Sequence, residues 1–121
     1  MKSFKIMLSA SLVAMATVGA AQADKLTLYC SAQEDWCQLM ANNFQDATGI
    51  KVAMTRKSSG ETFAQIKAES SNPKGDVWWG GTGDPHLQAA EEGLTASYIS
   101  PMRDQLHPWA ISQAESANNK T

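Results

Sequence analysis

The feature that most constrains this chain is a short strand pattern that runs directly into a glycine-rich loop and a helix start. Residues 76–85 read DVWWGGTGDP, with three glycines among the four positions 80–83. In an open α/β sheet, ligands bind at the carboxyl ends of the strands, where such loops gather. Glycine there lets the backbone approach a ligand closely or take a positive φ. We expect Asp84 to be the N-cap of the helix that follows and Pro85 to be its first residue.

Two more strand–loop–helix units precede this one. Residues 25–29 and 50–55 have strand patterns, and each is followed by a helix pattern, at 34–48 and from Ser58 onward. The apolar residues of the first helix recur at helical spacing on one face: Trp36, Leu39, Met40 and Phe44. Strand–helix alternation with short connections predicts an α/β fold with a parallel sheet and right-handed crossovers. In that fold the strand ends near Ser31, Ser58 and Gly80 open on one edge of the sheet.

The second helix has a clear start signal, because Ser58 stands three residues before Glu61 and the pair matches a capping box. Four residues of this helix are expected to face the sheet: Phe63, Ala64, Ile66 and Ala68. The third helix is expected over 85–92. Beyond it, the sequence suggests an extended piece at 94–99, and Pro101 and Pro108 are expected to break any helix.

The first 23 residues have the pattern of a secretory signal peptide. Lys2 and Lys5 precede an apolar run at 6–20, and residues 21–23 supply an A-x-A cleavage site. An uncleaved anchor is the alternative. We expect a mature chain over 24–121, exported to the periplasm. It holds eight Lys and Arg against twelve Asp and Glu, a net charge of −4, which argues against nucleic acid and anionic membranes as partners.

The two cysteines, Cys30 and Cys37, are seven residues apart. In an oxidising compartment this pair is expected to form a structural disulfide, with free buried thiols as the alternative. The spacing is not C-x-x-C, and no pair of histidines accompanies the thiols, so a redox or zinc site is not expected.

The loops at the predicted strand ends are rich in hydroxyl groups and free amides. A helix N-terminus with such groups suits a phosphate, phosphonate or carboxylate. The candidate ligand-binding residues are Ser31, Ser58, Ser59, Gly60, Thr62, Gly81 and Thr82. For Ser58, capping of the helix is the competing explanation. Arg56 and Lys57, just upstream, could add positive charge.

No catalytic constellation is visible, so we expect a protein that is not an enzyme. The two histidines, His86 and His107, have no nucleophile or carboxylate at a spacing that would form a triad or a metal cluster. Both are expected to be structural or merely exposed. Neither a metal nor another cofactor is expected. Trp78 and Trp79 should point to opposite faces of their strand, one into the core and the other towards a cleft.

Several motifs together resemble the extracellular solute-binding proteins of ABC importers, and within them the branch usually assigned to ferric-iron transport. The motifs lie at 29–32, 48–52, 59–63, 76–82 and 89–94, and the resemblance spans about 26–109. It implies a fold of two α/β lobes that close on a ligand. It also implies that residues 24–121 are the N-terminal part of the first lobe, cut before the second.

The resemblance implies a periplasmic substrate-binding component that docks on a membrane permease and is a monomer. Iron binders of this kind often place a histidine after the first strand and a glutamate after the third, and this chain has neither at those positions. Related proteins with a similar serine–glycine loop bind phosphorylated sugars or phosphonates. The expected ligand is therefore a small organic anion, with iron(III) as the competing ligand. The competing classes are an exported α/β enzyme acting on an anionic substrate and a nonfunctional fragment.

Overall fold

The computed structural model describes residues 25–121 of the chain. The predicted signal peptide and its cleavage site lie outside these residues. None of the described helices is long and apolar enough to cross a membrane.

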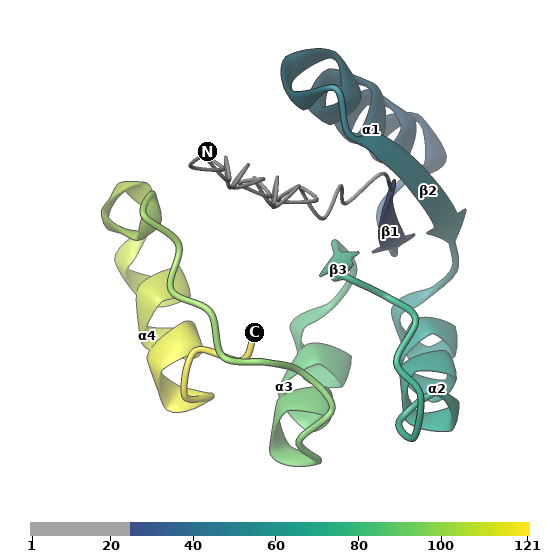
Figure 1. Ribbon diagram of the computed structural model, residues 1–121. Coiled ribbons are helices and arrows are strands. Elements are labelled where there is room, and N and C mark those ends of the chain that lie inside the picture. The colour runs from purple at the N-terminus through teal and green to yellow at the C-terminus, as the bar shows by residue number, and fades with distance from the viewer. Residues whose placement is uncertain (1–24) are drawn as a thin grey trace, which may run out of the picture.

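The described residues form a parallel three-stranded sheet with helices on both faces, as the alternation predicts (Figure 1). Strand β1 (Lys25–Cys30) is central, with β2 (Lys51–Arg56) on one side and β3 (Val77–Trp79) on the other. The register pairs Cys30 with Arg56 of β2 and with Trp79 of β3, so the three strands end side by side. The α/β fold class and the parallel sheet are confirmed.

Helix α1 (Glu34–Thr48) covers one face of the sheet, and α2 (Ser59–Ala68) and α3 (Gly83–Glu91) lie on the other (Figure 1). Leu28 and Cys30 of β1 pack with Cys37 and Ala41 of α1. Tyr29 points to the opposite face, where its hydroxyl donates to Glu69 Oε2 at 2.7 Å, just past the end of α2. Because side chains alternate along β1, Leu28 and Cys30 pack on one face of the sheet and Tyr29 packs on the other.

The predicted bounds of α1 are correct, but its apolar residues are not its buried ones. Trp36, Leu39 and Met40 are exposed, whereas Cys37 and Ala41 are buried. The Cys30–Cys37 disulfide holds α1 close to β1. The two residues of α1 that are buried at this contact are small, and its larger apolar side chains stay exposed.

Two expectations about the other helices are wrong. Ala64 and Ala68 are exposed, and the buried residue of α2 is Thr62, only 2% exposed. Helix α3 begins at Gly83 with Thr82 as its N-cap, so Asp84 is not the cap and Pro85 is the third helical residue. Proline is tolerated there because the first N–H groups of a helix have no partner within it.

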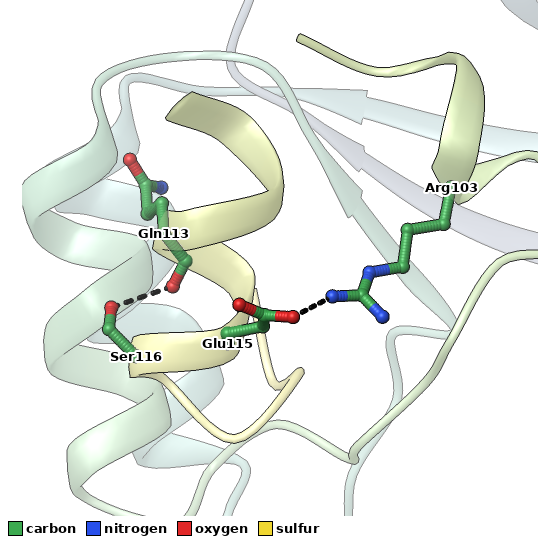
Figure 2. Close-up of polar contacts among 4 residues, drawn as sticks. All are labelled: Arg103, Gln113, Glu115 and Ser116. Carbon is green, nitrogen blue, oxygen red and sulfur yellow. Dashed lines mark hydrogen bonds and ion pairs between the residues drawn. The ribbon is translucent and has the colours of Figure 1, made fainter. Parts of the chain in front are cut away.

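In the C-terminal part, the expectation that Pro108 breaks a helix is wrong. Residues 94–99 form no strand, and Pro108 begins a helix, α4 (Pro108–Ser116), after a short 3₁₀ turn η1 (Arg103–Gln105). Proline is favoured at the first helical position because its fixed φ suits the helix. Figure 2 shows two contacts that order this part: Arg103 pairs with Glu115, and the Ser116 hydroxyl donates to the Gln113 carbonyl.

Candidate functional site

The ends of the three strands are joined by backbone hydrogen bonds. The Ser31 amide donates to the Trp79 carbonyl at 2.8 Å, and the Lys57 amide donates to the Cys30 carbonyl at 3.1 Å. Each strand then gives way to a loop that leads to a helix. The predicted convergence of these loops on one edge of the sheet is therefore present.

Four of the predicted hydroxyl groups form two pairs at this edge. Ser31 Oγ lies 3.1 Å from Thr62 Oγ1, and Ser59 Oγ lies 3.2 Å from Thr82 Oγ1. The Thr82 side chain makes no hydrogen bond to its own helix, although Thr82 is the N-cap of α3. Its hydroxyl is therefore free to meet Ser59. We call Ser31, Ser59, Thr62, Gly81 and Thr82 the hydroxyl cluster.

Gly81 brings the two pairs together because it has no side chain. Its φ is +91°, and a Cβ built on it would lie 2.9 Å from both Ser31 Cβ and Ser59 Oγ. Real Cβ atoms do not approach other atoms so closely, and L residues rarely adopt this φ. Glycine at this position therefore keeps the backbone against both serines.

Trp78 and His86 support the hydroxyl cluster, since Trp78 contacts Ser31 and His86 stacks on Trp78. Trp78 Nε1 donates to Ser31 Oγ at 3.0 Å, and the indole stacks on the His86 ring with 3.7 Å between centroids. His86 Nε2 lies 2.9 Å from the Gly80 carbonyl oxygen. His86 thus has the structural contact expected of it. The partner of the Trp78 indole could not be read from the sequence.

At the N-terminus of α2, the capping box is confirmed. Ser58 Oγ accepts from the Glu61 amide at 3.3 Å, and the Ser58 amide donates to Glu61 Oε2 at 3.0 Å. The hydrogen bonds from the Ser58 side chain and amide hold the pKa of Glu61 below its usual value of 4.5. The Ser58 hydroxyl is occupied by this cap, so a ligand-binding role for Ser58 stays a prediction.

The first two amides of α2, those of Ser59 and Gly60, have no acceptor within the helix. The Glu61 amide bonds to Ser58 Oγ, and the Thr62 amide bonds to the Ser58 carbonyl at 2.9 Å. Free amides at a helix N-terminus carry partial positive charge and point towards a bound anion. Gly60 therefore belongs with the cluster through its backbone.

A depression of about 430 Å³ opens beside the cluster. Ser31 and Gly81 belong to both, and the depression continues over Gln33, Trp36 and Trp79 to Arg56. Arg56 Nε donates to the Ala32 carbonyl at 3.1 Å, which holds the guanidinium at the rim. The sequence had placed Trp36 only on a helix face. Its spacing alone could not reveal that it lines the depression.

The disulfide lies directly under this edge. Cys30 and Cys37 are joined, as predicted, and both are fully buried. Since Cys30 immediately precedes Ser31, the bond fixes the start of the loop that carries the Ser31 hydroxyl. Across 25–121 no group of three or more His, Cys, Asp or Glu residues could hold a metal ion.

Comparisons with known proteins agree with this architecture. A family model described as bacterial extracellular solute-binding protein matches residues 26–115. An uncharacterized protein of Haemophilus influenzae is 41% identical over 111 residues, which are 88% of this chain and 32% of that protein. The chain thus spans about a third of the length of the curated relative that it matches.

Solved structures of periplasmic binding proteins also resemble this chain. AfuA of Actinobacillus pleuropneumoniae, solved with fructose-6-phosphate, is 46% identical with a TM-score of 0.68, over 69% of this chain and 26% of that one. The periplasmic binding protein P5PA is 36% identical with a TM-score of 0.74, over 78% of this chain and 30% of that one. Iron-bound HitA from Pseudomonas aeruginosa is 30% identical with a TM-score of 0.62, over 68% of this chain and 26% of that one. The chain therefore belongs to the family of bacterial extracellular solute-binding proteins.

Proposed function

We propose that this chain is part of a periplasmic substrate-binding component of an ABC uptake transporter. In this proposal the chain is exported by its first 23 residues, binds a small solute without transforming it, works as a monomer and delivers the solute to a membrane permease. Membership of the solute-binding family and the likeness to periplasmic binding proteins support these assignments.

We further propose that the hydroxyl cluster binds the anionic group of a phosphorylated sugar or a phosphonate. The observation that carries this proposal is the junction of Ser59, Gly81 and Thr82 at the N-terminus of α2. Hydroxyls and amides donate hydrogen bonds to phosphate oxygens, and the helix terminus adds a favourable field. AfuA, a similar protein, was solved with fructose-6-phosphate bound.

Iron(III) is the second candidate, since the similar protein HitA was solved with iron. Hard cations prefer several carboxylate or carbonyl oxygens, and iron also takes imidazole. The cluster offers hydroxyls and N–H donors instead. The donor set therefore supports the organic anion over the metal.

A thermal-shift series with the whole chain tests this proposal. Sugar phosphates, phosphonates and Fe(III)-citrate are added separately, because a ligand that binds only the native state raises the melting temperature. We expect a rise with a phosphorylated or phosphonate compound, lost in Ser59→Ala. Ser116→Ala is the matched control, because the Ser116 hydroxyl bonds to the Gln113 carbonyl in α4, outside the hydroxyl cluster, and this variant should keep the rise with ligand. A rise with iron alone would refute the anion assignment.

A further inference from the structure

A depression lies beside the hydroxyl cluster, and its lining includes tryptophan, glutamine and arginine residues that the proposed anion site does not use. Its volume of about 430 Å³ is in the range of small-molecule sites. It shares Ser31 and Gly81 with the cluster, so a ligand held by its anionic end at the cluster would extend into it.

Two tryptophans line this depression. Trp36 is the third residue of α1 and is 60% exposed, although tryptophan is usually highly buried. Trp79 is the last residue of β3 and is half-buried against the core. The indole of an exposed tryptophan offers flat apolar surface to the C–H face of a ring.

Two polar residues, Gln33 and Arg56, also line the depression. The Arg56 Nε–H is used by the Ala32 carbonyl, and none of the ion pairs found within 25–121 involves its guanidinium. The remaining guanidinium N–H groups are therefore available to hydroxyl oxygens. Gln33 lines the same depression, and a glutamine side chain can both donate and accept hydrogen bonds.

The charges on the two helices indicate which end of a ligand lies where. Helix α1 begins with Glu34 and Asp35, whose carboxylates disfavour an anion at the Trp36 end. The acidic residue in the first turn of α2 is Glu61, and its carboxylate is hydrogen-bonded back to Ser58. The cation Arg56 also lines the depression and attracts an anion. The free amides at the start of α2 and the acidic start of α1 together favour the anionic group at the Ser59 end, so the uncharged part of the ligand lies towards Trp36.

We infer that the depression binds the hydroxylated carbon skeleton of a sugar phosphate, with its C–H face on Trp36 and Trp79 and its hydroxyls on Gln33 and Arg56. This inference rests on the proposed function, because the hydroxyl cluster supplies the anchor for the phosphate. Trp36 then determines specificity: it separates sugar phosphates from inorganic phosphate and from small phosphonates.

Calorimetric titration of the whole chain with fructose 6-phosphate, inorganic phosphate and phenyl phosphate tests the inference. For Trp36→Ala we expect the affinity for fructose 6-phosphate to fall about three- to tenfold, with the affinity for inorganic phosphate unchanged. Trp109→Ala, in α4, is the matched control, since Trp109 is also exposed, at 69%, and lies outside the depression. It should leave all affinities unchanged. Arg56→Gln should weaken fructose 6-phosphate as well.

The outcomes separate this inference from the proposed function. If the wild-type chain binds none of the three compounds, the anion site itself is refuted. If it binds fructose 6-phosphate and Trp36→Ala binds it equally well, the anion site stands and the sugar subsite is refuted. Phenyl phosphate binding as tightly as fructose 6-phosphate would refute the hydroxylated skeleton, because an apolar ring would then suffice.

Discussion

Ser59 and Thr82 are 23 residues apart, yet their hydroxyl oxygens lie 3.2 Å from each other. Ser59 is the first residue of α2, and Thr82 is the N-cap of α3. Their contact joins the start of α2, which follows β2, to the start of α3, which follows β3. These two strands flank the central strand β1. The Thr82 amide also donates to Ser59 Oγ at 3.4 Å, so one serine hydroxyl holds both loops.

Gly81→Ala should destabilise the chain and disorganise this contact. The substitution forces a Cβ into the space between Ser31 and Ser59 at a positive φ. We expect the free energy of unfolding to fall by about 1–3 kcal/mol, measured by urea denaturation.

Gly60→Ala is the matched control for that substitution. A Cβ at Gly60 meets nothing within 4 Å, and the residue lies in α2. Alanine is the better helix former, so the free energy of unfolding should rise by up to about 1 kcal/mol. Equal effects of the two substitutions would show that Gly81 has no special position.

Removing the disulfide should destabilise the chain in a way that reduction reproduces. The double variant Cys30→Ala/Cys37→Ala frees a loop closed by residues seven apart. We expect a loss of about 2–3 kcal/mol, mainly because the unfolded chain is no longer restricted. Reduced wild type should match the variant in denaturant midpoint. An oxidised wild type no more stable than the variant would contradict the structural role of this bond.

Acid should weaken the chain partly through Glu61 and Glu69. The pKa of Glu69 is held below 4.5 by hydrogen bonds from Gln65 and from Tyr29, and that of Glu61 by Ser58. A lowered folded-state pKa contributes stability above pH 4.5, which is lost as the pH falls through the folded value. Glu61→Gln can keep the capping box but cannot titrate. Its unfolding free energy should therefore depend less on pH below 4.5 than that of wild type. Superimposable pH profiles would refute this role of Glu61.

Alkali should weaken the chain through Tyr29. Burial first, and then the hydrogen bond to Glu69, raises the pKa of Tyr29 above 10.0. A raised folded-state pKa gives stability that is complete below pH 10.0 and is lost as the pH rises through the folded value. Tyr29→Phe should cost about 1 kcal/mol at neutral pH through the lost hydrogen bond. The variant should also lose less stability than wild type above pH 10.0, and an equal loss would contradict the assignment.

Much of the fold could be predicted because local signals agreed with each other. The three strand patterns, the Ser58–Glu61 capping box and the Cys30–Cys37 pair all recur in the structure. Parallel strands end at one edge, so the convergence of the strand ends near Ser31, Ser58 and Gly80 followed from the topology.

The remaining features depend on packing that no local pattern encodes. An N-cap residue has an extended backbone, and in α3 that residue is Thr82 rather than Asp84. The contact between the Thr82 and Ser59 hydroxyls favours this arrangement. Thr62, rather than Ala64 or Ala68, is buried, and its hydroxyl contacts that of Ser31. Adjacent tryptophans gave no sign that Trp78 would donate to Ser31.

The most direct measurement of the central claim is an amide nuclear magnetic resonance spectrum of the chain during titration with fructose 6-phosphate. If the strand-end cluster binds the phosphate, the amide signals of Ser59, Gly60, Gly81 and Thr82 should move the most. In a separate titration with inorganic phosphate, the same amide signals should also move, but by less than with fructose 6-phosphate. Signals that move only in the C-terminal part, around α4, or that do not move at all, would contradict an anion site at this edge of the sheet.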